Sequence, residues 1–192
     1  LIKRRPDFQL EHRDVLHFID FSEKTIKLGT EVYELTDFQA PTVNPEQPES
    51  LTAEEEKIIS HLLNNFRSSD KLKRHVEFLQ EKGAMYLSYN GNLLIHGCLP
   101  LHENGDFKSF TVNKEAHAGR DLLDFFDQEV RKCLAHPENS TDLATDLMWY
   151  LWVGECSSLF GKTAMTTFER YYIKDKNTHV EKKNPYYQLR EE

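Results

Sequence analysis

The chain has 192 residues and a mass of 22.6 kDa, which suits one compact domain or one domain with a tail. Its 24 basic and 32 acidic residues leave a formal charge of -8, so binding to nucleic acid or to an anionic membrane is not expected. Hydrophobic residues make up 39% and the mean hydropathy is -0.65, and no apolar run reaches the ~18 residues of a membrane span. We therefore expect a water-soluble protein without nucleic-acid or membrane partners.

The cysteines and the first residues bear on the cellular compartment and on whether the chain is part of a longer protein. Cys98, Cys133 and Cys156 lie far apart and form no CxxC pair, which favours a reducing cytoplasm over a disulfide framework. The chain begins Leu-Ile-Lys, with neither an initiator methionine nor a signal peptide. We therefore expect a cytoplasmic protein of which this chain is a piece.

Residues 1–50 are expected to form a strand-rich segment that ends in a proline-rich connector. Between residues 15 and 35 the alternation of apolar and polar residues around turns is typical of strands. Residues 37–50 contain Pro41, Pro45 and Pro48, too many for a helix or a central strand. We interpret them as an ordered connector, and a flexible linker is the open alternative.

Residues 51–83 are expected to form a helical hairpin. Thr52 with Glu55 three residues later makes a capping box, and Ser68 or Ser69 is expected to cap a second helix that Gly83 ends. The apolar faces are Ile58, Ile59, Leu62, Leu63 and Phe66 on the first helix, and Leu72, Val76 and Leu79 on the second. We interpret the pair as a scaffold or as an interface with another subunit.

Residues 84–192 show mixed strand and helix patterns. Asn90-Gly91 predicts a hairpin of residues 85–89 and 92–95, and a second hairpin is expected from residues 100–102 and 107–112. Helices are predicted over residues 119–135 and 142–152, and the last forty residues are typical of irregular, functional surface. Trp149 and Trp152 are expected in the core, and an aromatic wall beside a phosphate cleft is the alternative.

One short segment carries residues suited to chemistry. Residues 92–95 form an apolar strand that places His96 at its C-terminal end, and Gly97 would let the backbone turn and approach a ligand closely. A neutral imidazole held at a strand end is a good ligand for Mn²⁺, Fe²⁺ or Zn²⁺. From spacing alone, a purely structural histidine is the competing interpretation.

The same segment resembles a known motif. Residues 94–100 read Leu-Ile-His-Gly-Cys-Leu-Pro and resemble the V-H-G-G-L-x-P block of calcineurin-like metallophosphoesterases. Over nearly the whole chain, further blocks resemble class III fructose-1,6-bisphosphatases in that family's order. These blocks are Leu63–Phe66, Lys82–Leu87, Ala118–Leu123, Trp149–Trp152, Ser158–Lys162, Thr167–Tyr171 and Lys182–Tyr187.

The resemblance implies a fold and a metal centre. The class is α/β, or mixed α+β, and the family's core is an α/β/β/α sandwich of two mixed sheets. Residues 84–192 would supply the second half of this phosphoesterase-like domain, with the helical hairpin as an addition. The block's histidine ligates one of two bridged metal ions, so His96 is expected to be a metal ligand, most simply of Mn²⁺. The D-x-H, G-D-x-x-D-R and G-N-H-[DE] blocks do not occur, so no catalytic residue is assigned.

Substrate contacts are sought among the basic residues of the C-terminal third. Arg170 lies between aromatic residues and could present a planar fork to a phosphate, and Lys162 is a second candidate. A surface salt bridge is the alternative role for Arg170. The expected partners are fructose 1,6-bisphosphate, small-metabolite regulators and further copies of the chain.

The expected function is therefore that of an internal portion of a fructose-1,6-bisphosphate 1-phosphatase of gluconeogenesis, in which a metal-activated water hydrolyses the phosphomonoester. The fragment by itself is expected to be inactive, because a two-metal centre needs several ligands and only His96 transfers from the family pattern. The alternative is a non-catalytic regulatory or interaction module of a larger metabolic protein.

Overall fold

The computed structural model describes residues 1–189, which group into two compact units. The first unit joins Leu1–Leu10, Phe78–Met165 and the residues from Glu181 onward. The second unit joins Glu11–Glu77 and Thr166–Val180. Segments distant in sequence therefore build each unit.

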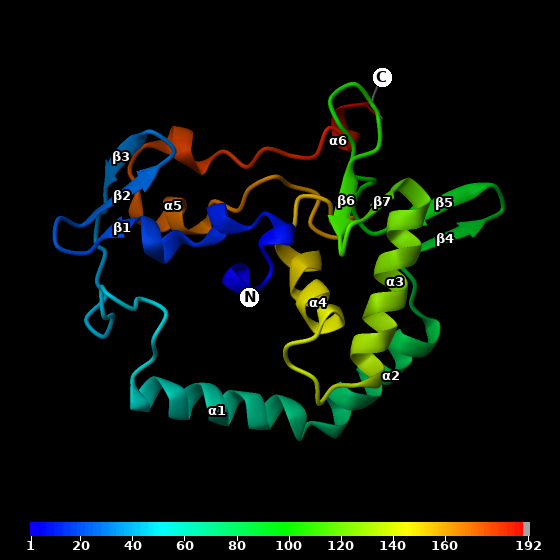
Figure 1. The fold of residues 1–192 in the computed structure, drawn as a ribbon, viewed down its shortest axis with the longest axis horizontal. Coiled ribbons are helices and arrows are strands. Elements are labelled where there is room, and N and C mark those ends of the chain that lie inside the picture. Colours follow the sequence, from blue (N-terminus) through cyan, green and yellow to red (C-terminus); the bar gives the residue numbers. More distant parts are fainter. Residues whose placement is uncertain (190–192) are drawn as a thin grey trace. The chain divides into compact units, whose positions relative to one another are not determined.

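The core of the first unit lies around helices α3 (Gly119–Ala135) and α4 (Leu143–Val153), which pack side by side (Figure 1). The aromatic rings of Phe110 and Tyr150 meet with centroids 4.6 Å apart inside this core. The N-terminal 3-10 helices, η1 (Ile2–Arg4) and η2 (Pro6–Phe8), bring Phe8 into it. Other buried members of the core are Leu10, Met85, Val112, Leu122, Leu123, Phe126, Leu147 and Leu151.

The predicted hairpin at Asn90-Gly91 is confirmed. Strands β4 (Tyr86–Tyr89) and β5 (Asn92–Ile95) pair antiparallel. Asn90 and Gly91 have φ of 50° and 76°, the left-handed conformation that a two-residue hairpin turn of this kind requires.

The second predicted hairpin is confirmed at its turn end only. Residues 101 and 107 form an antiparallel bridge, and the Lys108 N–H donates to the Pro100 carbonyl at 2.9 Å. The rest of the predicted second strand, β6 (Ser109–Val112), pairs instead with β7 (Glu115–Ala118). The turn residues Asn113 and Lys114 have φ of 51° and 70°, which joins these two strands tightly. This turn was not predicted, because lysine is unusual in the left-handed conformation.

The expectation that Trp149 and Trp152 belong to the core is also wrong. Their exposed fractions are 43% and 68%. Helix α4 instead buries Leu147, Tyr150 and Leu151, which follow one another at helical spacing on the face toward α3. The two tryptophans lie on the exposed remainder of the same helix.

The second unit contains a three-stranded antiparallel sheet in the order β1 (Ile19–Asp20), β2 (Thr25–Leu28) and β3 (Glu31–Glu34). The preceding residues form the 3-10 helices η3 (Glu11–Arg13) and η4 (Val15–Phe18), so strand structure begins later than predicted. The core of this unit is Ile19, Ile26, Leu35 and Ile173. Helix α5 (Thr167–Tyr172) packs Tyr172 on Phe38, and η5 (Lys176–His179) follows it.

Helices α1 (Ala53–Arg67) and α2 (Asp70–Lys82) form where the sequence predicts them. The capping box is complete, since the Thr52 side chain accepts from the Glu55 N–H and the Glu55 carboxylate accepts from the Thr52 N–H. The Ser69 hydroxyl accepts from the Leu72 N–H at 3.3 Å. Neither helix contains a buried residue, and the apolar face of α1 is largely exposed.

The last helix is α6 (Tyr186–Leu189). The described residues thus combine helices with three small antiparallel sheets, which confirms the mixed α+β class. Within residues 1–189 these sheets do not join into the two mixed sheets of a phosphoesterase sandwich, because the strands form one three-stranded and two two-stranded sheets that remain separate. Across the same residues, no helix combines the length and the apolar character that crossing a bilayer requires.

Candidate functional site

His96 directly follows β5 in the first unit, and its side chain is exposed. The strand before it is held by pairing with β4, in which Ile95 lies opposite Tyr86. The Tyr86 hydroxyl in turn donates to the Asp124 carboxylate of α3 at 2.9 Å. The imidazole is therefore presented to solvent from a strand end that is tied to the core of the unit.

A close backbone approach is present at Gly97, and it is made to another segment of the chain. A Cβ at Gly97 would lie 2.5 Å from the carbonyl oxygen of Ser158. The next residue, Cys98, donates its N–H to the same oxygen at 3.1 Å. The turn that follows His96 is thus fixed against the segment after α4.

Cys98 has a structural role at this turn. Its side chain is fully buried, and burial raises the pKa of the thiol to about 11. The thiol is therefore protonated at neutral pH, and a protonated thiol is neither a nucleophile nor a metal ligand.

The segment after α4 is itself held by buried polar groups. The Tyr150 hydroxyl accepts a hydrogen bond from the Cys156 N–H at 3.1 Å, and burial raises the pKa of Tyr150. The Ser157 hydroxyl accepts from the Leu159 N–H at 3.1 Å. These bonds keep the backbone against which Gly97 packs in one conformation.

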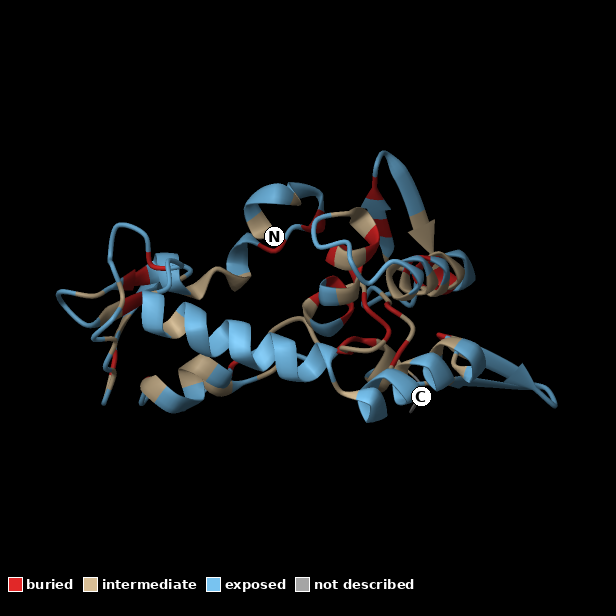
Figure 2. Ribbon diagram, turned by 90° about the horizontal axis from the view of Figure 1, so that it is seen from below, coloured by how far each residue is buried: buried red, intermediate tan, exposed pale blue. Residues whose placement is uncertain are grey.

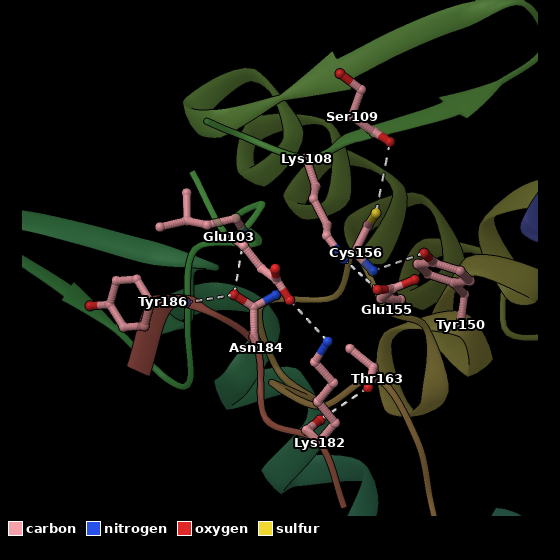
Figure 3. A network of polar contacts seen from close by, with 11 residues as sticks. Glu103, Lys108, Ser109, Tyr150, Glu155, Cys156, Thr163, Lys182, Asn184 and Tyr186 are labelled. Atoms are coloured by element: carbon pink, nitrogen blue, oxygen red, sulfur yellow. Dashed lines mark hydrogen bonds and ion pairs between the residues drawn. The ribbon is translucent and has the colours of Figure 1, made fainter. Parts of the chain in front are cut away.

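A polar network, drawn in Figure 3, connects this segment to the residues after His96. Asn184 is buried, and its side-chain oxygen accepts from the N–H groups of Leu101 at 3.2 Å and Tyr186 at 3.0 Å. The Asn184 N–H donates to the Gly161 carbonyl at 3.0 Å. Sequence reasoning missed this asparagine, because only the fold brings residues 101, 161 and 184 together.

A hollow of about 510 Å³ opens beside this network. It is lined by His102, Glu103, Asn104, Lys108, Glu155, Thr163, Lys182 and Pro185. Lys182 pairs with Glu103 at 3.1 Å, and Lys108 pairs with Glu155 (Figure 3). Because each ammonium group already faces a carboxylate, the hollow has balanced charge and is no ready-made phosphate site.

The two basic candidates lie in different units. Lys162, in the first unit, forms an ion pair with Glu181, and its backbone bridges to Lys183. Arg170, in the second unit, is exposed on α5, and one of its terminal nitrogens lies 3.5 Å from the His179 carbonyl. Arg170 and Lys162 remain predictions as substrate-binding residues.

The described residues of the chain supply at most some of the ligands of a metal centre. Among residues 1–189, no three His, Cys, Asp or Glu side chains are grouped so that they could hold a metal ion. His96 fits the role of one ligand, since its ring is exposed at a fixed strand end, but one imidazole does not make a site.

Comparison with known proteins places this arrangement in a family. The family described as Firmicute fructose-1,6-bisphosphatase matches residues 1–192. Curated relatives named class 3 fructose-1,6-bisphosphatase include those of Lactococcus lactis, 86% identical over 192 residues, and Bacillus velezensis, 54% identical over 192 residues. That of Staphylococcus epidermidis is 53% identical over 192 residues. No solved structure matches the chain.

The chain therefore belongs to the Firmicute fructose-1,6-bisphosphatase family. In these three alignments the whole chain is covered, but only about 30% of each relative's length. The resemblance noted in the sequence is confirmed by the matched family and by the relatives' names.

Proposed function

We propose that the chain is an internal portion of a metal-dependent phosphatase that removes the 1-phosphate of fructose 1,6-bisphosphate in gluconeogenesis. Membership of the fructose-1,6-bisphosphatase family over the full 192 residues supports this proposal. The structural observation that carries it is His96, whose exposed imidazole follows a paired strand and precedes a turn fixed on Ser158.

The metal that we propose is Mn²⁺, in a two-ion centre completed by residues outside this chain. Bound ions of this kind supply a water of lowered pKa that attacks phosphorus in line. His96 would bind one ion through a ring nitrogen. Because the backbone on both sides of His96 is hydrogen-bonded, little further ordering of this ligand would be needed on binding.

Arg170 and Lys162 are the proposed contacts for phosphate oxygens, to which guanidinium and ammonium groups donate charge-assisted hydrogen bonds. For Lys162 this role requires that the ammonium exchange or share its present partner, Glu181. Small-metabolite regulators are proposed on the resemblance alone. A cytoplasmic location is supported by three cysteines that are all free.

The decisive experiment uses the longer protein that contains this chain. In that protein His96→Ala should abolish nearly all phosphate release from fructose 1,6-bisphosphate and reduce the bound Mn²⁺. His75→Ala removes another exposed histidine, on α2, and should change neither quantity. Normal turnover and normal metal content in the His96→Ala protein would contradict the assignment.

A non-catalytic interaction module is the second candidate, and the solvent-exposed apolar face of α1 favours it. The same experiment separates the two candidates. A longer protein that binds no divalent ion and releases no phosphate would favour the interaction module.

A further inference from the structure

Helix α1 carries an apolar stripe that nothing else in the described residues of the second unit covers. Its members are between 45% and 65% exposed, and Figure 2 shows the helix almost wholly in the exposed colour. They are Ile58, Ile59, Leu62, Leu63 and Phe66. A helix of 15 residues is marginal by itself in water, and a contiguous exposed apolar patch marks an interaction surface.

Two opposite charges lie on the same border of this stripe. Glu56 and Arg67 are eleven residues apart, which is about three helical turns, so they project in nearly the same direction. Both side chains are exposed, and neither has an ion-pair partner among residues 1–189. The midpoint between them falls beside Leu62, which is also the middle of the apolar stripe.

This symmetry makes the surface complementary to itself. If a second α1 lies antiparallel across a two-fold axis near Leu62, Glu56 of each copy faces Arg67 of the other. In this register Ile59 lies within one residue of the level of Leu63 in the other copy, and the two Leu62 side chains lie next to the axis. The arrangement covers the stripe and gives both charges a partner.

We propose that α1 is a self-association surface, on which a second copy of this chain packs its own α1 in antiparallel orientation. The charge pattern argues for a second copy, because an unrelated partner would not require an acid and a base placed symmetrically about the centre of the stripe. With five large side chains from each copy the interface is small, so the dimer is weak and depends on concentration.

The test measures the mass of the 192-residue chain by light scattering over a range of concentrations. The mass should rise from 22.6 kDa toward twice that value. Glu56→Arg and Arg67→Glu should each prevent the rise, because like charges then face each other. Mixing the two variants should restore a dimer, since the copy with two basic positions complements the copy with two acidic ones.

Lys57→Glu is the matched control. It reverses a charge of the same helix on the side opposite to the stripe, and it should leave dimerisation unchanged. Circular dichroism of every variant should show unaltered helix content, because the changed residues are exposed.

A second measurement does not depend on charge. Under mild oxidation Leu62→Cys should form a covalent dimer across the axis, whereas Asn64→Cys, on the far side of α1, should behave like the unmodified chain. A chain that stays monomeric at all concentrations, as it would if this face binds another part of a longer protein, would overturn the proposal. So would a mixture of charge variants that fails to dimerise, or equal crosslinking of both cysteine variants.

Discussion

Replacing Gly97 by alanine tests whether the turn after β5 fixes His96. The added Cβ would lie 2.5 Å from the carbonyl oxygen of Ser158, a backbone atom that cannot rotate away. One of the two segments must therefore move. That movement weakens the hydrogen bond from the Cys98 N–H to the same oxygen, in a region where Cys98 is fully buried.

The expected cost combines steric overlap with the weakened bond. Inserting a methyl group into a packed interior costs about 1–3 kcal/mol, and a backbone hydrogen bond contributes about 1 kcal/mol. We expect Gly97→Ala to lower the free energy of unfolding by about 2–4 kcal/mol. Gly91→Ala, in the neighbouring hairpin turn, meets no atom within 4 Å and should cost only the strain of its positive φ, about 1–2 kcal/mol.

Urea denaturation of the chain, followed by circular dichroism, measures both variants. In the longer protein, Gly97→Ala should also reduce bound metal and phosphate release, because His96 moves with the turn. An unfolding free energy within about 0.5 kcal/mol of the unmodified chain would refute the reasoning, since surface changes of no structural consequence fall in that range.

Three further outcomes are expected. Asp146→Asn should lower the unfolding free energy by about 2 kcal/mol at pH 7, because the buried carboxylate accepts hydrogen bonds from Arg4 and Arg5; an unchanged denaturation midpoint would contradict this. Burial alone would raise the pKa of Asp146, but these bonds hold the pKa below its usual value. The carboxylate therefore contributes fully to the free energy of unfolding above about pH 4, and the contribution is lost as the pH falls through the lowered pKa. The unfolding free energy of the variant should depend less on pH in this acidic range. The isolated chain should release no phosphate from fructose 1,6-bisphosphate, and calorimetry should show no tight binding of two Mn²⁺ ions. If the isolated chain did turn over substrate, and lost this activity in His96→Ala, the active site would lie within the chain. In the longer protein Arg170→Ala should raise KM or lower kcat without changing metal content, and unaltered kinetics would return Arg170 to a surface role.

The elements that the sequence predicted are those specified by neighbours in the chain. Thr52 and Glu55 lie within one helical turn and cap α1 whatever surrounds them. Asn90-Gly91 adopts its turn conformation locally, and the Asp142 side chain accepts from the Thr145 N–H to begin α4. The His96 block was recognisable for the same reason, because its residues are contiguous.

Tertiary structure decided which faces are buried and which distant residues meet. The pattern of apolar residues in α4 was compatible with a buried Trp149, but packing on α3 buries the face that carries Leu147 and Tyr150. Asn184 acquired its partners only when residues 101 and 161 folded against it. Burial and long-range hydrogen bonding depend on contacts between segments far apart in the chain, and a local pattern does not encode the partner against which a face will pack.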